Sequence, residues 1–217
     1  MRERVNVEIP TRDILAKYLH YYSGKDLYLG TDVLAPTSET LFGNTRPLHI
    51  DFGCGRGEYV NMMAEQYPER NFVGIDFHAL SLYVGVNRAA QAHLPNVKFV
   101  LADFPKLAEY IPSETVEQAS VLFPAPIVNP KFEKKEVMRV PFIEQVHRVL
   151  GQDNKFLFVT DAQWYFEEKV KLMQDLQLFA LLVIAQGIEA PITRYQQQWQ
   201  SKGIPSNRAE LLKRPSH

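Results

Sequence analysis

From residue 47 onward, short apolar runs alternate with longer segments in which apolar and polar residues recur at helical spacing. The runs suit buried strands and are far shorter than the roughly 20 residues that a membrane-spanning helix needs. This alternation favours an α/β fold, with a doubly wound, mostly parallel seven-stranded sheet and helices on both faces. The expected strands are Leu48–Phe52, Asn71–Asp76, Val97–Asp103, Ala119–Phe123, Lys155–Thr160, Leu178–Gln186 and Arg208–Lys213, and the expected helices are Glu58–Gln66, Ala79–His93, Lys135–Leu150 and Trp164–Leu176.

The first 46 residues have a different pattern. Thr11 is a candidate N-cap for a helix over Thr11–Tyr22, and a loop rich in Gly, Thr, Ser and Pro follows it. We therefore expect an N-terminal helix and loop (residues 1–46) and an α/β domain (residues 47–217). Two interpretations of the first part stay open, because its tyrosines could pack on the core or the segment could form a lid over a pocket.

A glycine-rich turn joins the first expected strand to the first expected helix, with glycines at positions 53, 55 and 57. Glycines allow a tight turn and close approach of a ligand to the main chain, and the helix that follows offers free N–H groups. The dinucleotide fingerprint G-x-G-x-x-G would need glycine where Glu58 stands. The carboxylates of Asp51 and Glu58, which flank this turn, would repel a negatively charged pyrophosphate. A ligand with a cationic amino acid end, such as S-adenosylmethionine, fits better.

Two further acidic residues stand where the next expected strands end. Asp76 follows Asp51 by 25 residues, and a carboxylate there can accept hydrogen bonds from both hydroxyls of a ribose. Asp103 closes the third expected strand, where it can accept from an adenine amino group. Either residue alone is more often a helix cap. Together with the glycine turn, in this order, they predict S-adenosylmethionine as the cofactor.

Charge and cysteine usage narrow the class of protein. Lys and Arg number 24 against 25 Asp and Glu, a formal net charge of -1, whereas proteins that grip phosphate backbones usually carry a basic surplus. This balance argues against nucleic acid as the substrate but leaves room for a local basic patch. The single cysteine, Cys54, and the scattered histidines provide neither an intrachain disulfide nor a metal site. The polar N-terminus favours a cytoplasmic protein without a membrane anchor.

The stretches D-F-G-C-G-R-G, V-G-I-D and F-V-L-A-D resemble class I S-adenosylmethionine-dependent methyltransferases. Over roughly residues 47–211 the chain is similar to the tRNA (guanine-N7)-methyltransferase, or TrmB-like, family. That family carries F-x-D-P-W-P-K-K-R-H after its fourth strand, then F-x-T-D and T-x-Y-E. The resemblance implies a methyltransferase enzyme on a Rossmann-like fold. It assigns cofactor contacts to Asp51, Gly53, Gly55, Asp76, Phe77, Ala102, Asp103 and Phe123, substrate contacts to Ala125, Asp161, Thr193, Arg194, Tyr195 and Gln196, and catalytic roles to Asp161 and Tyr195.

The chain departs from the family pattern in the motifs that would contact the methyl acceptor, which are called the acceptor side below. Apolar residues there are typical of a small-molecule pocket. The mixed charges of residues 131–139 are typical of a solvated helix face, and each lost phosphate contact lowers affinity for RNA. The departures are Ala125 for the motif's aspartate, Ile127 for its tryptophan, Asn129 and Pro130 for its lysine pair, Phe132 for its histidine and Gln196 for the final glutamate.

We therefore predict an S-adenosylmethionine-dependent transferase that acts on a small molecule by methyl transfer to a lone-pair nitrogen, with tRNA the less expected partner. Catalysis would rest on proximity and alignment. Three alternatives stay open. S-adenosylmethionine could be the sole substrate, with cyclisation or cleavage of its aminobutyrate arm releasing methylthioadenosine. The chain could also be a tRNA guanine-N7 methyltransferase, or a non-catalytic S-adenosylmethionine-binding protein. The oligomeric state is not readable from the sequence.

Overall fold

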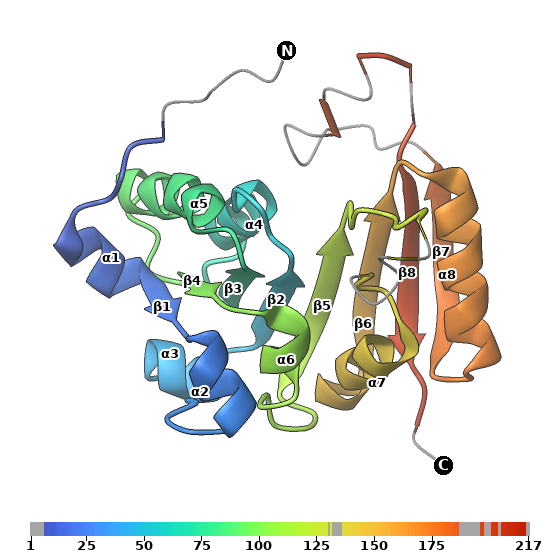
Figure 1. The fold of residues 1–217 in the computed structure, drawn as a ribbon, viewed down its shortest axis with the longest axis horizontal. Coiled ribbons are helices and arrows are strands. Elements are labelled where there is room, and N and C mark those ends of the chain that lie inside the picture. Colours follow the sequence, from blue (N-terminus) through green and yellow to red (C-terminus); the bar gives the residue numbers. More distant parts are fainter. Residues whose placement is uncertain are drawn as a thin grey trace.

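The computed structural model of the chain describes residues 7–129, 131, 136–186, 196–197, 201–203 and 205–215. Within these ranges the strands form one eight-stranded sheet in the order β1-β4-β3-β2-β5-β6-β8-β7 (Figure 1). Strands β1 to β6 pair in parallel, whereas β8 is antiparallel to both β6 and β7. The strands are β1 Leu19–Tyr21, β2 Leu48–Phe52, β3 Asn71–Asp76, β4 Val97–Leu101, β5 Val116–Leu122, β6 Leu150–Thr160, β7 Phe179–Gln186 and β8 Asn207–Lys213, and the helices are α1 Arg12–Tyr18, α2 Gly24–Leu29, α3 Ser38–Phe42, α4 Glu58–Gln66, α5 Ala79–Gln91, α6 Phe104–Ala108, α7 Val140–Val149 and α8 Gln163–Asp175.

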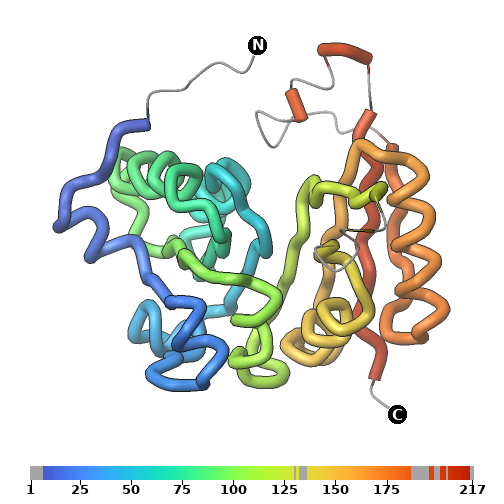
Figure 2. The backbone as a smooth tube through the Cα atoms, viewed as in Figure 1, coloured from blue at the N-terminus to red at the C-terminus, as the bar shows by residue number. Residues whose placement is uncertain are grey.

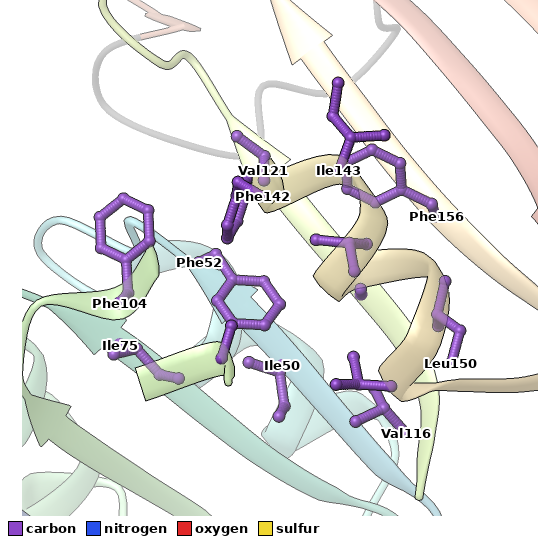
Figure 3. Close-up of a cluster of buried hydrophobic side chains, with 14 of the residues drawn as sticks. Ile50, Phe52, Ile75, Phe104, Val116, Val121, Phe142, Ile143, Leu150 and Phe156 are labelled. Atoms are coloured by element: carbon purple, nitrogen blue, oxygen red, sulfur yellow. The ribbon is translucent and has the colours of Figure 1, made fainter. Parts of the chain in front are cut away.

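Alternate side chains of β2 face two different layers of the molecule, as the pleat of a strand requires. Ile50 and Phe52 are buried in the larger core, which they share with side chains of α6, α7 and α8. Figure 3 shows Phe52 beside Phe104 of α6 and Phe142 of α7, and the Phe52 and Phe142 rings meet edge to face with centroids 5.4 Å apart. His49 faces the opposite layer, where its ring packs against Tyr59 of α4. This alternation leaves His49 and Asp51 on the side of β2 that faces away from the main core.

The second core lies between α1, α4, α5 and the strands β3 and β4. Phe99 of β4 is fully buried at its centre. A Cβ atom at Gly57 would overlap the Phe99 ring, and one at Gly85 would lie 2.8 Å from it. Glycine at both positions therefore lets the start of α4 and the middle of α5 pack closely on the sheet.

The predicted α/β class with a mostly parallel sheet is confirmed, and β2, α4 and β3 have the expected bounds. The extra strand arises where a helix was expected. The helix predicted over Thr11–Tyr22 ends at Tyr18, and Leu19–Tyr21 forms β1, which pairs in parallel with the edge of β4. An unpaired edge of β4 would expose a row of backbone donors and acceptors, and β1 satisfies them. Figure 2 shows this segment running along that edge.

The rest of the N-terminal segment contains α2 and α3, where a loop was predicted. Tyr18 and Tyr22 are buried, and the Tyr22 hydroxyl donates to the Leu34 carbonyl oxygen at 2.6 Å, whereas Tyr21 and Tyr28 are exposed. The domain division at residue 46 and a lid role for this segment stay predictions. In the described part of the chain, no helix combines the length and apolar character that crossing a bilayer requires.

The helix predicted over Lys135–Leu150 begins only at Val140. Arg139 has extended backbone, with φ -103° and ψ 160°, and Pro141 stands in the first turn, where proline is favoured because its missing N–H is not needed. Glu136, which precedes the helix, contacts a different part of the fold, since it forms an ion pair with Lys169 of α8 at 2.7 Å. Among the described residues of this charge run, Glu136 and Arg139 therefore do not share one solvated helix face.

Candidate active site

The candidate site lies at the carboxyl ends of β2, β3 and β4, which are neighbours in the sheet. Ligands of open parallel sheets bind outside this edge, at the point where the strand order reverses. The reversal falls at β2, because β3 lies on one side of β2 and β5 on the other. Three of the predicted carboxylates, Asp51, Asp76 and Asp103, lie at or just beyond the ends of these strands.

The glycine turn after β2 is fastened to β3 by backbone hydrogen bonds. The N–H groups of Gly53 and Cys54 both donate to the Ile75 carbonyl oxygen, at 2.8 and 3.0 Å. Gly55 has φ +55°, and a Cβ added there would meet no atom within 4 Å. The backbone at Gly55 therefore borders open space, as the approach of a ligand to the main chain requires.

Asp51 is the most deeply buried of the candidate cofactor carboxylates, at 1% exposure. Its Oδ1 accepts a hydrogen bond from the Ser120 hydroxyl of β5 at 2.6 Å. Burial raises the pKa of Asp51 to about 7, the Ser120 hydrogen bond opposes that rise and the Asp76 charge adds to it. A cationic ligand group beside Asp51 would relieve this cost, because it compensates the buried charge.

Asp76 organises the turn as well as facing the site. Its Oδ2 accepts from the Gly55 N–H at 2.9 Å, and its Oδ1 accepts from the His78 N–H at 2.8 Å. Burial raises the pKa of Asp76, and these backbone hydrogen bonds act in the opposite direction. Each carboxylate oxygen has a second lone pair, so Asp76 can also accept from a ribose hydroxyl.

Asp103 lies beyond β4 instead of closing it, and it caps the short helix α6, which the sequence did not predict. Its Oδ1 accepts from the Lys106 N–H at 3.3 Å. Asp103 and the exposed Phe77 also line a cavity of about 640 Å³ with Phe104 and Phe142. Ala102, the residue before Asp103, is buried. Asp103, the predicted adenine contact, therefore borders a hollow whose lining includes both aromatic and charged side chains.

The acceptor-side residues follow β5 and β6. Phe123 comes directly after β5 with φ +53°, which is unusual for an aromatic residue, and its N–H donates to the Val159 carbonyl oxygen at 2.7 Å. Ala125 is exposed, Asp161 follows β6 at partial exposure and Gln196 is buried. The other predicted acceptor residues lie outside the described residues: Thr193, Arg194 and Tyr195.

Sequence reasoning missed Ser120, which hydrogen-bonds to Asp51, and His49, which contacts Ser120. Ser120 stands opposite Asp51 in the parallel register of β2 and β5, although 69 residues separate them. His49 Nε2 lies 3.1 Å from the same Ser120 oxygen. The available signal was the polar character of His49 and Ser120 within apolar strands, because buried polar side chains need partners.

The fold defines the class of protein first. The crystal structure of a 30S ribosomal A1408 methyltransferase from an uncultured bacterium matches with a TM-score of 0.60 and 16% identity, over 85% of this chain and 96% of that one. At this identity the likeness shows the fold alone, which is that of class I methyltransferases.

The chain belongs to the methyltransferase family Methyltransf_4, described as "Putative methyltransferase", whose model matches residues 45–209. A tRNA (guanine-N(7)-)-methyltransferase of Rubrobacter xylanophilus is 32% identical over 215 residues, which cover 97% of this chain and 96% of the relative. A protein of the same name from Chloroherpeton thalassium is 30% identical over 216 residues, with coverage of 97% and 96%. The predicted family resemblance and methyltransferase activity are thereby confirmed.

The prediction of a small-molecule substrate, with tRNA the less expected partner, is wrong. The names of these relatives contradict it. The physical error was to treat every formal charge as surface charge. Asp51 and Asp76 are buried with raised pKa values, and Glu136 is paired with the buried Lys169. Asp51 and Asp76 count in full toward the net charge of -1 although burial favours their uncharged forms, whereas the Glu136–Lys169 pair adds nothing to that sum.

Proposed function

We propose that this chain is a tRNA (guanine-N7)-methyltransferase that uses S-adenosylmethionine as its methyl donor. The observation that carries the proposal is its similarity, along nearly the whole chain, to relatives named for that reaction. The net charge of -1 does not oppose this reaction, because the formal count includes Asp51 and Asp76, whose burial favours their uncharged forms.

The residues at the ends of β2 to β4 fit this cofactor. Asp51 is a buried carboxylate that a cationic amino group would neutralise, and the open space at Gly55 admits the amino acid arm. Asp76 would accept from the ribose hydroxyls. Asp103 and Phe77 would hold adenine at the cavity that they line together with Phe104. When bound, S-adenosylmethionine supplies a methyl group activated by its sulfonium.

The acceptor side has a simple chemical task. Guanine N7 carries a free lone pair, so the enzyme has no proton to remove before transfer. Its contribution is to hold N7 in line with the methyl carbon and to exclude water. Asp161, at the end of β6, would stabilise the positive charge that develops on the guanine ring. Phe123, Ala125 and Gln196 stay the proposed neighbours of the base.

Recognition of tRNA also needs contacts with phosphates. Lys131 and Arg139 are exposed basic residues of the charge run after β5. Each Lys or Arg that reaches a phosphate releases a counterion, so binding should weaken steeply as salt is added.

The test uses two tRNA transcripts that differ only in whether the guanines carry N7 or its 7-deaza replacement. With S-adenosylmethionine carrying a labelled methyl group, the ordinary transcript should gain 7-methylguanosine, and the 7-deaza transcript should gain no label. S-adenosylhomocysteine should appear in equal amount. Label on the 7-deaza transcript would contradict N7 as the acceptor, and methylthioadenosine as the nucleoside product would contradict methyl transfer itself.

A further inference from the structure

Three buried polar side chains form a hydrogen-bonded chain within the sheet, next to the glycine turn. The Ser120 hydroxyl of β5 donates to Asp51 Oδ1 of β2 at 2.6 Å, and His49 Nε2 lies 3.1 Å from the same hydroxyl oxygen. His49, Asp51 and Ser120 are 2%, 1% and 0% exposed. Buried side chains in such a chain are held in one arrangement, because each lost partner leaves a polar group unsatisfied.

The direction of the hydrogen bonds follows from the chemistry of each group. Since the Ser120 proton points at Asp51, the Ser120 oxygen is left to accept from His49 Nε2. Burial, and then the Arg70 charge, lower the pKa of His49 to about 3, so its ring is neutral at physiological pH. The single ring proton therefore sits on Nε2. The rings of Tyr59 and Phe72, each with its centroid 5.5 Å from that of His49, hold the imidazole in place.

We propose that His49 and Ser120 are positioning residues that aim Asp51 at the amino group of the cofactor, and that cofactor binding drives off a proton which Asp51 carries in the free protein. The inference rests on the proposed cofactor site and on nothing about tRNA. In the free protein, Asp51 is only 1% exposed and lies near the acidic Asp76, and both conditions favour its protonated form. Binding of an ammonium group favours the carboxylate, and the proton passes to the solvent.

The groups around Asp51 explain why its carboxylate is favoured only when a cationic ligand group is bound. On its own strand the neutral His49 reaches Asp51 only through Ser120, and on β3 the acidic Asp76 raises the pKa of Asp51 further. Burial also raises the pKa values of the Cys54 thiol and the Tyr59 hydroxyl, which keeps both groups uncharged. Ser120 is the neighbour that favours the charged form, because its hydroxyl donates to Asp51. The charged residues one shell further out are Arg70, which acts on His49, and Arg208 and Glu210, which act on Tyr59.

The proton can be counted by isothermal titration calorimetry with S-adenosylhomocysteine, which carries the same amino acid arm. Titrations at pH 6 and pH 8.5 in buffers of different ionisation enthalpy give the protons released at each pH. Release of close to one proton at pH 6, falling toward none at pH 8.5, is expected, and binding should be about tenfold weaker at pH 6 than at the alkaline plateau. The Asp51→Asn variant should lose this release.

The positioning roles are tested by the pH at which the dissociation constant changes. Ser120→Ala removes the hydrogen bond that favours the Asp51 carboxylate, so the midpoint should move up by about one pH unit. His49→Phe keeps a ring between Tyr59 and Phe72 and should move the midpoint less, in the same direction. Ser120→Thr should restore the midpoint. Ser38→Ala, which removes another buried serine hydroxyl next to the opposite end of β3, is the matched control and should leave it unchanged.

The outcomes separate this inference from the tRNA proposal. Binding without proton release at pH 6, or a folded Ser120→Ala protein with an unchanged midpoint, overturns the inference. If S-adenosylhomocysteine does not bind at all, the cofactor assignment fails and the inference fails with it. If protons are released but tRNA gains no methyl group, only the tRNA proposal is overturned.

Discussion

The cofactor edge, formed by Asp51, the glycine turn and Asp76, is built differently from the acceptor edge that follows β5 and β6. At the cofactor edge, backbone hydrogen bonds between β2, β3 and their loops fix the positions of the candidate groups. On the acceptor side, charges pair across the fold, as Glu136 does with Lys169. A short stretch of sequence therefore indicates the cofactor, whereas the nature of the acceptor depends on contacts that no short stretch contains.

The largest effect is expected from removing the charge of Asp51. Asp51→Asn keeps the shape of the side chain but takes away the partner of the cofactor's amino group, so affinity for S-adenosylhomocysteine should fall about 100-fold. Calorimetry at pH 8 measures this loss. Thermal unfolding serves as the control and should show no loss of stability, because an uncharged amide replaces a buried carboxylate. Retained affinity in a folded variant would place the amino group elsewhere.

Alanine substitutions at two glycines of the turn should have different effects, one on stability and the other on cofactor binding. Gly57→Ala places a Cβ against the Phe99 ring at φ +65°, so the free energy of unfolding should fall by about 2 to 4 kcal/mol. Gly55→Ala meets open space, should cost only about 1 to 2 kcal/mol from its positive φ, and should weaken cofactor binding instead. Urea unfolding and calorimetry on both variants measure the contrast. The reverse pattern would assign the ligand contact to Gly57.

On the acceptor edge, Asp161→Asn should lower kcat for tRNA methylation about tenfold and leave cofactor affinity unchanged. The carboxylate is proposed to act on the charge that develops on guanine, which arises only during transfer. Steady-state kinetics with saturating tRNA and a calorimetric titration test the two halves. A fall in cofactor affinity with unchanged kcat would move Asp161 to the cofactor edge.

The smallest effects are expected at the exposed basic residues. Lys131→Ala and Arg139→Ala should each weaken tRNA binding a few-fold and lower the salt dependence of log Kd by about one phosphate contact. Filter binding over a salt series measures the slope. Lys171→Ala is the control, since Lys171 is an exposed lysine on α8 that pairs with its helix neighbour Asp175. Equal slopes for all three variants would show that RNA does not follow this segment.

The sequence predicted most of the sheet because β2, β3 and the turn between them owe their structure to local patterns: apolar runs, three glycines and acidic strand ends. It missed β1, because pairing with the edge of β4 overrode a helix-like pattern at Leu19–Tyr21. It missed the chain from His49 through Ser120 to Asp51, because strand register joins residues about 70 positions apart. Net charge misled for the same reason, since it cannot distinguish a buried carboxylate from an exposed one.

The central claim is that the cofactor edge serves transfer of a methyl group to guanine N7 of tRNA. It is tested most directly by incubating the protein with labelled S-adenosylmethionine and a total cell extract, then separating RNA from small molecules. The account predicts label in the tRNA fraction, recovered after nuclease digestion as 7-methylguanosine. Label confined to the small-molecule fraction, with unlabelled tRNA, would contradict it.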